Sequence, residues 1–290
     1  MNNVILNVDT GVDDAYAIIL LEKHGIRPDF IVASSGNSHI ENAITNTAGV
    51  VKILNSSVPV YKGSSKPLVR DAYYEDYHGK NGMAGYNFNY AIDECENGIL
   101  KMYEALKRKK YTIINTCPLT SIALLLLMDE NIEKNINEII IMGGAFHSNS
   151  YGNGNVGNAE FNIYYDPEAA KTVFNSNIKE YIMPLDVTMN PDFSVMNDDL
   201  KKMKDTGVIG DFMHKTLKYM VERYNSFEMH DPIATMAYFN KNAFKYINGD
   251  ISVDSNGVTT LNENKNSNKY VACSMDKSEY IKSIYGKFFN

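Results

Sequence analysis

The chain has 290 residues, 44% hydrophobic and 22% charged, a composition ordinary for a globular protein long enough to bury a sizeable core. Its net charge is −7 at pH 7, which argues against a nucleic-acid partner because nucleic-acid-binding surfaces are basic.

Cysteine usage and apolar run length bear on where the protein works. Cys95, Cys117 and Cys273 are an odd number of cysteines with neither metal-ligand spacing nor a CxxC pair. We interpret them as reduced thiols of a cytoplasmic protein. No apolar run approaches the ~20 residues of a membrane span, and no leader-like segment precedes the first apolar run. We therefore expect no membrane partner.

Apolar, β-rich segments alternate with segments of helical periodicity. In chain order, the predicted elements are a strand at 3–8, a helix at 13–25, a strand at 29–36, a helix at 41–55, a strand at 58–63, a strand, turn and helix within 111–128, a strand at 137–146, a helix at 166–176 and a strand at 179–188. Strands this apolar are typical of a parallel sheet covered by helices on both faces. With no internal repeat or linker, the pattern predicts a single doubly wound α/β domain over residues 1–290, with a mostly parallel central sheet.

Two long polar segments interrupt this alternation, at 69–90 and at 145–162. Both are rich in Gly, Asn and Tyr and are longer than ordinary connections. Long loops of this kind often carry binding residues, although each is also compatible with plain surface. Their length and aromatic content favour a role in a site.

Three carboxylates, Asp9, Asp13 and Asp14, lie where the first predicted strand meets the first helix. In a parallel α/β sheet this joint is where ligands bind. Like charges so close together oppose ionisation, and a hard divalent cation such as Ca²⁺ or Mg²⁺ would resolve the conflict. Aspartates also cap helix N-termini. One aspartate would suffice for a cap, but the residues alone leave both interpretations open.

Other predicted strand ends add polar groups at equivalent places. Asn37 follows the second strand, and Thr116 ends the strand within 111–128 with a carbonyl that suits a hard cation. Further along, His230 and Asp231 precede an apolar helix that has a proline in its first turn. A His-Asp pair in that position can also be a simple helix cap.

Nine short motifs together resemble the inosine-uridine-preferring nucleoside hydrolases. The stretch NVDTGVDDA is similar to that family's DxDxxxDD signature. The others follow in the family's order: SSGN (34–37), PVYKG (59–63), HGKNGMAG (78–85), NTCPLTSIA (115–123), IMGGAF (141–146), GNVGNAEFNIYYDPEAA (from Gly154), PLDVT (184–188) and HDPIA (230–234). The resemblance covers about residues 5–235. It implies an enzyme that uses Ca²⁺ to hydrolyse the N-glycosidic bond of ribonucleosides, giving ribose and a free base for nucleoside salvage.

The resemblance also implies a role for particular residues. Asp9, Asp14, Asp231 and the Thr116 carbonyl would hold the calcium ion, with Asp9 also the general base. His230 would protonate or position the leaving base. The implied substrate-binding residues are Asp13, Asn162 and Asp231 at the ribose 2′- and 3′-hydroxyls, Glu160 and Asn155 at the 5′-hydroxyl, Asn37, Met142 and Phe161 in the sugar pocket, and His78 near the base. Family members assemble as homodimers or homotetramers, which we expect here.

The chain departs from the family pattern at Asn7, which replaces the first Asp of the signature. The lost charge would weaken calcium binding or the basicity of Asp9. It leaves a rival interpretation, a non-catalytic protein that binds nucleosides or ribose. A phosphotransfer enzyme is a second rival, but the loops offer Asn, Glu and His rather than a phosphate-binding constellation.

The base pocket is expected from 73–86 and 215–230, the latter with Tyr219, Arg223, Tyr224 and Phe227. The chain has no tryptophan for stacking on a base. Together with His230, this favours a broad or pyrimidine-inclined preference.

Overall fold

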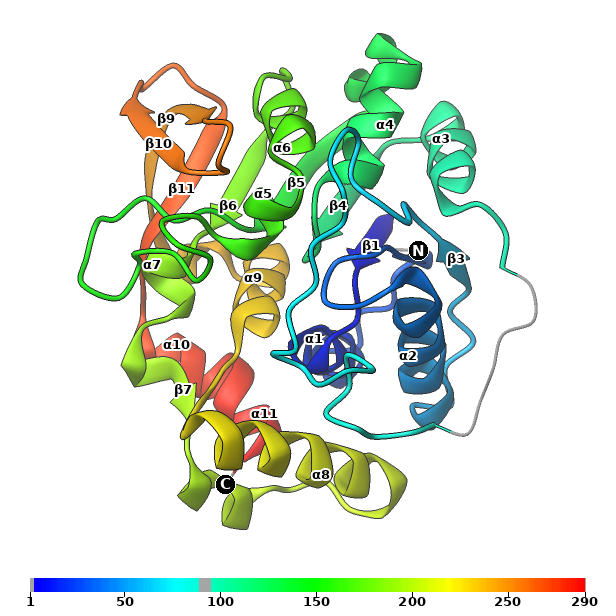
Figure 1. The fold of residues 1–290 in the computed structure, drawn as a ribbon, viewed down its shortest axis with the longest axis vertical. Coiled ribbons are helices and arrows are strands. Elements are labelled where there is room, and N and C mark those ends of the chain that lie inside the picture. Colours follow the sequence, from blue (N-terminus) through cyan, green and yellow to red (C-terminus); the bar gives the residue numbers. More distant parts are fainter. Residues whose placement is uncertain (1–2, 89–94, 290) are drawn as a thin grey trace.

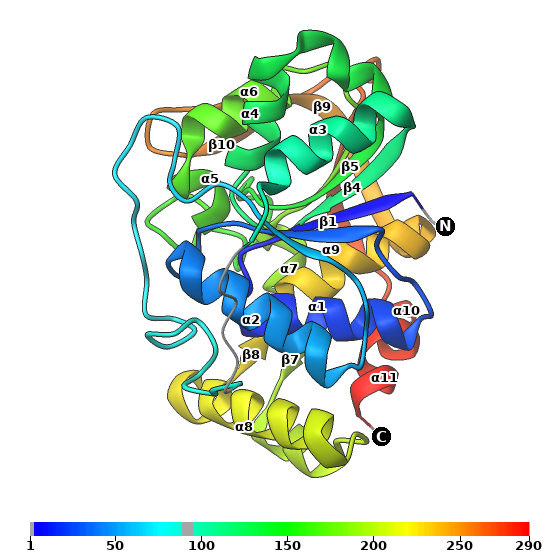
Figure 2. The same cartoon turned by 90° about the vertical axis from the view of Figure 1, so that its right-hand side faces the viewer.

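A computed structural model describes residues 3–88 and 95–289 as a nine-stranded sheet with helices on both faces (Figures 1 and 2). Residues 89 and 90, the end of the predicted loop 69–90, lie outside the described part. The strands of this sheet are β1 (Val4–Val8), β2 (Phe30–Ala33), β3 (Val60–Lys62), β4 (Tyr111–Asn115), β5 (Ile136–Met142), β6 (Glu180–Met183), β9 (Phe244–Val253), β10 (Thr259–Glu263) and β11 (Lys269–Met275). The helices are α1 (Val12–Lys23), α2 (Ile40–Ile53), α3 (Gly98–Arg108), α4 (Thr120–Met128), α5 (Phe161–Tyr165), α6 (Pro167–Phe174), α7 (Leu185–Thr188), α8 (Gly207–Tyr224), α9 (His230–Phe239), α10 (Lys277–Tyr280) and α11 (Gly286–Phe288).

The strand order is β10-β9-β11-β6-β5-β4-β1-β2-β3, and every pairing from β11 to β3 is parallel. The strands β3-β2-β1-β4-β5-β6 reproduce the doubly wound order, in which the chain reverses direction across the sheet between β1 and β4. The crevice at this reversal is where such sheets bind ligands. The predicted α/β fold with a mostly parallel sheet is confirmed.

Core packing explains why apolar residues predominate in the parallel strands. In β1, Val4, Leu6 and Val8 face the core under α1 and α9, whereas Ile5 faces the opposite core under α3, α4 and α6. Successive strand side chains point to opposite faces, so a strand covered on both sides must be apolar throughout. Figure 2 shows the two helical layers, with α8 outside the α1 layer.

The predicted strand 179–188 is too long. β6 ends at Met183, and residues 185–188 form α7 instead. Pro184 separates the two elements: it has no N–H to continue the strand ladder but suits the start of a helix.

The last quarter of the chain extends the sheet beyond the predicted elements. β11 adds in parallel to β6, and β9 and β10 continue the edge in antiparallel orientation. β7 (Ser194–Val195) and β8 (Phe227–Glu228) pair as a separate two-stranded antiparallel ribbon. The segment between these two strands contains α8. None of the described helices is long and apolar enough to cross a membrane.

Candidate active site

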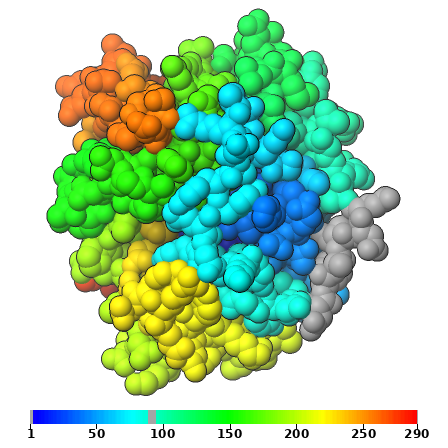
Figure 3. All heavy atoms as spheres, viewed as in Figure 1, coloured from blue at the N-terminus to red at the C-terminus, as the bar shows by residue number. Residues whose placement is uncertain are grey.

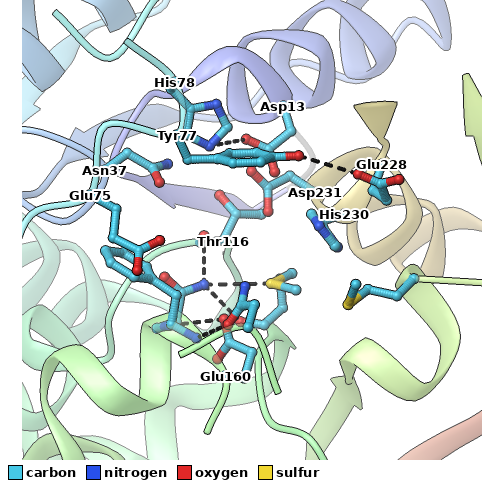
Figure 4. Close-up of a pocket in the computed structure, with 15 residues that line it drawn as sticks. Asp13, Asn37, Glu75, Tyr77, His78, Thr116, Glu160, Glu228, His230 and Asp231 are labelled. Atoms are coloured by element: carbon cyan, nitrogen blue, oxygen red, sulfur yellow. Dashed lines mark hydrogen bonds and ion pairs between the residues drawn. The ribbon is translucent and has the colours of Figure 1, made fainter. Parts of the chain in front are cut away.

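A cavity of about 260 Å³ opens at the carboxyl ends of the parallel strands (Figure 4). Its lining comes from segments far apart in the sequence: Asp13, Asn37, Glu75, Tyr77, His78, Thr116, Met142, Asn155, Glu160, Phe161, Asn162, Met189, Glu228, His230 and Asp231. None of these lining residues is a lysine or arginine. In Figure 3 the loop from 69 to 88, in cyan, crosses the middle of the face toward the viewer. The cavity is therefore rich in hydrogen-bond acceptors and has no fixed positive side chain among its described lining residues.

A buried cluster of carboxylates lies at the inner side of the cavity. One oxygen each of Asp13, Asp14 and Asp231 lies within 4.8 Å of the others. Asp9, at the end of β1, is fully buried beside them, and its Oδ1 has no hydrogen-bond partner; nor has Oδ1 of Asp13. Burial, reinforced by neighbouring negative charges, raises the pKa of Asp9, of Asp231 and of Asp13, the last to about 8. Burial raises the pKa of Asp14 as well.

Local backbone geometry fixes two members of the cluster. The backbone N–H of Asn37 donates to Oδ2 of Asp9 at 2.6 Å, which leaves Oδ1 of Asp9 free. Gly36 permits this approach, because a Cβ atom there would lie 1.9 Å from Oδ2 of Asp9. Asp14 accepts the Thr116 hydroxyl at 2.6 Å and the Gly11 backbone N–H at 2.9 Å, so it also caps α1. The helix-cap interpretation therefore applies to Asp14, which is also a member of the carboxylate cluster.

The loop 145–162 contains a further buried acid, Glu160, outside this cluster. Glu160 caps α5 by accepting the backbone N–H groups of Asn162 and Ile163, and it also accepts that of Gly144. Burial nevertheless raises its pKa to about 7, although these three N–H groups lower it. The Asn162 amide donates to the carbonyls of Thr116 and Met142, which ties α5 to the ends of β4 and β5.

Two histidines flank the acids: His78 is buried, and His230 is partly buried. Burial, with a contribution from the charge of His230, lowers the pKa of His78 to about 3. His78 Nδ1 accepts the Val12 backbone N–H, so its proton is on Nε2, 3.6 Å from Oδ1 of Asp13. Burial likewise lowers the pKa of His230, and its Nδ1 is hydrogen-bonded to the Thr188 hydroxyl at 2.8 Å.

The structure brings the predicted site residues together. Asp13, Asn37, His78, Thr116, Met142, Asn155, Glu160, Phe161, Asn162, His230 and Asp231 line the cavity, and Asp9 and Asp14 lie directly behind it. Sequence reasoning did not single out Glu75, Tyr77, Met189 or Glu228. A signal for Glu228 was available: in FEMH, polar residues alternate with apolar ones, which places Glu228 and His230 on the same side of an extended segment.

Both segments expected to form the base pocket reach the cavity, 215–230 through Glu228 and His230, but the residues named there for base contact, Tyr219, Arg223, Tyr224 and Phe227, do not line it. Phe227 is fully buried against Tyr16. Tyr224 stacks behind Tyr77, with ring centroids 4.5 Å apart, and its hydroxyl donates to the Tyr77 carbonyl. Arg223 pairs with Asp76 at the surface. Tyr224 and Arg223 therefore support the 75–78 segment, and this segment lines the cavity.

Asn7 does not face the cavity. Its amide donates to Oδ1 of Asn115 at 2.6 Å, and its own Oδ1 accepts the Ser34 hydroxyl at 3.1 Å. Ser34 is hydrogen-bonded in turn to Ser121. The Asn115 amide donates to the Cys117 carbonyl, in the turn directly after Thr116. The asparagine thus belongs to a buried network of neutral groups that orders this turn.

Replacing Asn7 by Asp is expected to destabilise the protein by about 1–3 kcal/mol and to lower kcat/KM about tenfold, although it restores the family residue. An aspartate cannot donate to Asn115, whose amide is already committed to the Cys117 carbonyl. Thermal unfolding and steady-state kinetics measure the two effects. The same change at Asn262, exposed on β10, is the control. A more stable or more active Asn7→Asp protein would contradict the network's role.

An acceptor-rich cavity over buried acids at the strand-order reversal has the features of a small-molecule site of an α/β enzyme. Residues 4–282 match the family described as inosine-uridine preferring nucleoside hydrolase. The chain is 34% identical over 234 residues to the pyrimidine-specific ribonucleoside hydrolase RihB of Escherichia coli O1:K1 / APEC, covering 76% of this chain and 72% of that protein.

Solved structures share the fold. The purine-preferring ribonucleoside hydrolase from Gardnerella vaginalis superimposes with a TM-score of 0.86 at 24% identity, over 98% of this chain and 97% of that one. An inosine-uridine preferring nucleoside hydrolase from Bacillus anthracis superimposes with a TM-score of 0.79 at 19% identity, and the match covers 99% of each chain. The chain belongs to the inosine-uridine preferring nucleoside hydrolase family, which confirms the resemblance found in the motifs.

Proposed function

We propose that the protein hydrolyses the N-glycosidic bond of ribonucleosides to ribose and a free base, with a bound Ca²⁺ ion. The observation that carries the proposal is the buried carboxylate cluster at the inner side of an acceptor-rich cavity. Family membership supports the reaction class, and of the expected broad or pyrimidine-inclined base preference, the pyrimidine-specific RihB relative supports the pyrimidine-inclined alternative.

The residues present fit a hard divalent cation. Two buried carboxylate oxygens, Oδ1 of Asp9 and of Asp13, have no hydrogen-bond partner. Burial, reinforced by the neighbouring negative charges, raises the pKa of both acids, and a cation would favour their ionised forms. We assign the ion to Asp9, Asp14, Asp231 and the Thr116 carbonyl. When bound, it supplies positive charge that keeps these acids ionised and lowers the pKa of water that it binds.

Asp9 is the general base in this proposal. The Asn37 N–H occupies its Oδ2, so Oδ1 remains to accept a proton from the attacking water. That water attacks C1′ as the C1′–N bond breaks, and the electron pair of this bond passes to the base. Asp13, Asp231 and Asn162 orient the sugar through its 2′- and 3′-hydroxyls, and the acids stabilise the positive charge that develops on the ring.

His230 positions the leaving base in this proposal. When the Thr188 hydroxyl donates to Nδ1, the proton of the neutral ring is on Nε2 and can form a hydrogen bond to the base. His78 has Nδ1 committed to Val12, and its Nε2 faces Asp13, 3.6 Å from Oδ1. The attacking water gives one proton to Asp9, and the departing base takes up one proton from solvent, so His230 keeps its own.

Release of reducing sugar from inosine, uridine, cytidine and adenosine, before and after removal of the cation, tests the proposal. Cation-dependent ribose release is the expected result. If none of the four is hydrolysed while the cation is bound, the protein is a nucleoside- or ribose-binding member of the family instead. The resemblance further supports a homodimer or homotetramer, the element pattern one domain per chain, and the cysteine usage a cytoplasmic protein; sedimentation velocity and cell fractionation test the oligomeric state and the location.

Nucleoside 5′-monophosphates are expected to be hydrolysed at least about 100-fold more slowly than the nucleosides. Glu160, which we place at the 5′-hydroxyl, is buried, and no lysine or arginine is among the described lining residues that could receive a phosphate. Comparing kcat/KM for uridine and its 5′-monophosphate measures the effect. Equal kcat/KM values would contradict the placement of Glu160 at the 5′-hydroxyl.

A further inference from the structure

The cavity has a second side that the sugar contacts do not use. With the ribose at Asp13, Asp231 and Asn162, the remaining lining includes Glu75, Tyr77, Met189 and Glu228. Figure 4 shows Glu228 across the cavity from Glu160, with its carboxylate directed at the Tyr77 hydroxyl. This side is open to the base of a bound nucleoside.

Three hydroxyl groups hold the Glu228 carboxylate in place. Ser226 and Ser194 donate to its Oε1 at 2.6 and 3.4 Å, and Tyr77 donates to its Oε2 at 3.2 Å. Backbone pairing of Ser194 with Glu228 joins β7 to β8 and fixes the main chain at this point. The carboxylate is therefore preorganised, and Oε2 keeps capacity for a second donor, since each carboxylate oxygen can accept two hydrogen bonds.

Tyr77 is the neighbour that defines the shape of this side. Its ring stacks on Tyr224, and the Tyr224 hydroxyl donates to the backbone carbonyls of Asp76 and Tyr77. The phenol is held where it can lie beside a base without being displaced from Glu228. A planar base thus meets an aromatic ring and a fixed carboxylate together.

An ionised carboxylate accepts hydrogen bonds and cannot donate them. It attracts an exocyclic amino group and repels a carbonyl oxygen at the same ring position. No lysine or arginine among the described lining residues offsets that repulsion. Cytosine differs from uracil, and adenine from hypoxanthine, by this exchange of amino for oxo.

We propose that Glu228 is a specificity-determining residue that selects nucleosides with an amino-bearing base, such as cytidine and adenosine, over their oxo counterparts, uridine and inosine. The inference rests on the proposed hydrolysis. It narrows the substrate class by the functional group on the base rather than by purine or pyrimidine ring size.

The test is kcat/KM of the wild-type protein and of Glu228→Gln for the two matched pairs, cytidine with uridine and adenosine with inosine. Glutamine offers an N–H to an oxo group and a weaker acceptor to an amino group. We expect the amino-to-oxo ratio to fall about tenfold or more in both pairs, the size of one charge-assisted hydrogen bond. Glu222→Gln, on the exposed side of α8 beside Lys218, is the matched control and leaves the ratios unchanged.

A purely structural role for Glu228 predicts a different pattern. Loss of the β7–β8 anchor would lower all four kcat/KM values together, so ratios that stay within about twofold of the wild type overturn the proposal. Tyr77→Phe, which keeps Glu228 and removes a competing donor, is expected to retain or strengthen the amino preference even if Glu228→Gln folds poorly. If the wild-type protein releases ribose from none of the four, the proposed function fails, and calorimetric Kd ratios for the same pairs decide the role of Glu228.

Discussion

Replacing Asp231 by Asn is expected to lower kcat/KM for ribonucleosides roughly 10³-fold and to raise the Tm of the cation-free protein. The loss of activity follows from removing a carboxylate that we assign to both the cation and the sugar. The gain in stability follows from burial, because Asp231 lies among Asp9, Asp13 and Asp14, whose charges raise its pKa. An asparagine keeps a hydrogen bond to Asp13 without adding a charge.

Calorimetric cation titration, differential scanning calorimetry with a chelator and steady-state kinetics measure these opposite effects. Asp192→Asn is the matched control, because Asp192 pairs with Lys277 at the surface, and its Tm and kcat/KM should both stay near the wild type. A fall in the Tm of cation-free Asp231→Asn, or activity near the wild type, would contradict the assignment. The variant thus separates the contribution of Asp231 to kcat/KM from its effect on the stability of the cation-free protein.

Removing the cation is expected to abolish ribose release and to make the Tm fall as the pH rises from about 6.5 to 8. Asp13 has its pKa raised from 3.8 to about 8 in the folded protein. A raised carboxyl pKa gives stability that is present below the unfolded value and is lost as the pH rises through the folded value. The cation-free protein must therefore be less stable at pH 8 than at pH 6.5.

The choice of pH window follows from the other buried groups. His78 and His230 have lowered pKa values, so their burial penalises the fold at low pH and stability rises toward 6.5, which opposes the aspartate effect. Glu160 and Glu180, each with a pKa near 7, contribute the same slope with and without a cation. The difference in Tm between loaded and cation-free protein isolates the cluster and should grow with pH.

Scanning calorimetry at several pH values, with calcium or with a chelator, makes this measurement. The Asp231→Asn variant should show a shallower pH dependence in the chelator, because one member of the repelling set is gone. A Tm difference that is constant across the window would mean that the aspartates are ionised without a cation, which would contradict the proposed site.

The inner half of the site could be predicted because its residues lie at the ends of strands that can be recognised from their own apolar sequences. Asp9, Thr116 and Met142 end β1, β4 and β5, and the parallel sheet brings those ends to one edge. For the outer half the sequence indicated the segments 73–86 and 215–230 but not the residues, because Tyr77 and Glu228 meet only through the packing of α8 and the β7–β8 ribbon. Periodicity carries no information about which loop such a ribbon will contact.

Asn7 shows the limit of reading a family pattern one position at a time. Taken alone it is a lost charge, which suggested a weakened site. In the structure, its side-chain amide is hydrogen-bonded to Asn115 and Ser34, and Ser34 in turn to Ser121, positions that belong to two other motifs. The C-terminal strands were missed for a related reason: β11 pairs with β6, a partner remote in the sequence.

The distribution of the carboxylates along the chain has a consequence for biosynthesis. Asp9, Asp13 and Asp14 leave the ribosome many seconds before Asp231 at typical elongation rates, because more than 200 residues separate them. Until α9 docks beside α1, the first three acids lack their fourth partner and remain accessible to water. In the proposed site, cation capture would thereby be coupled to the synthesis of α9, so nascent chains that still lack this helix would compete poorly for the ion.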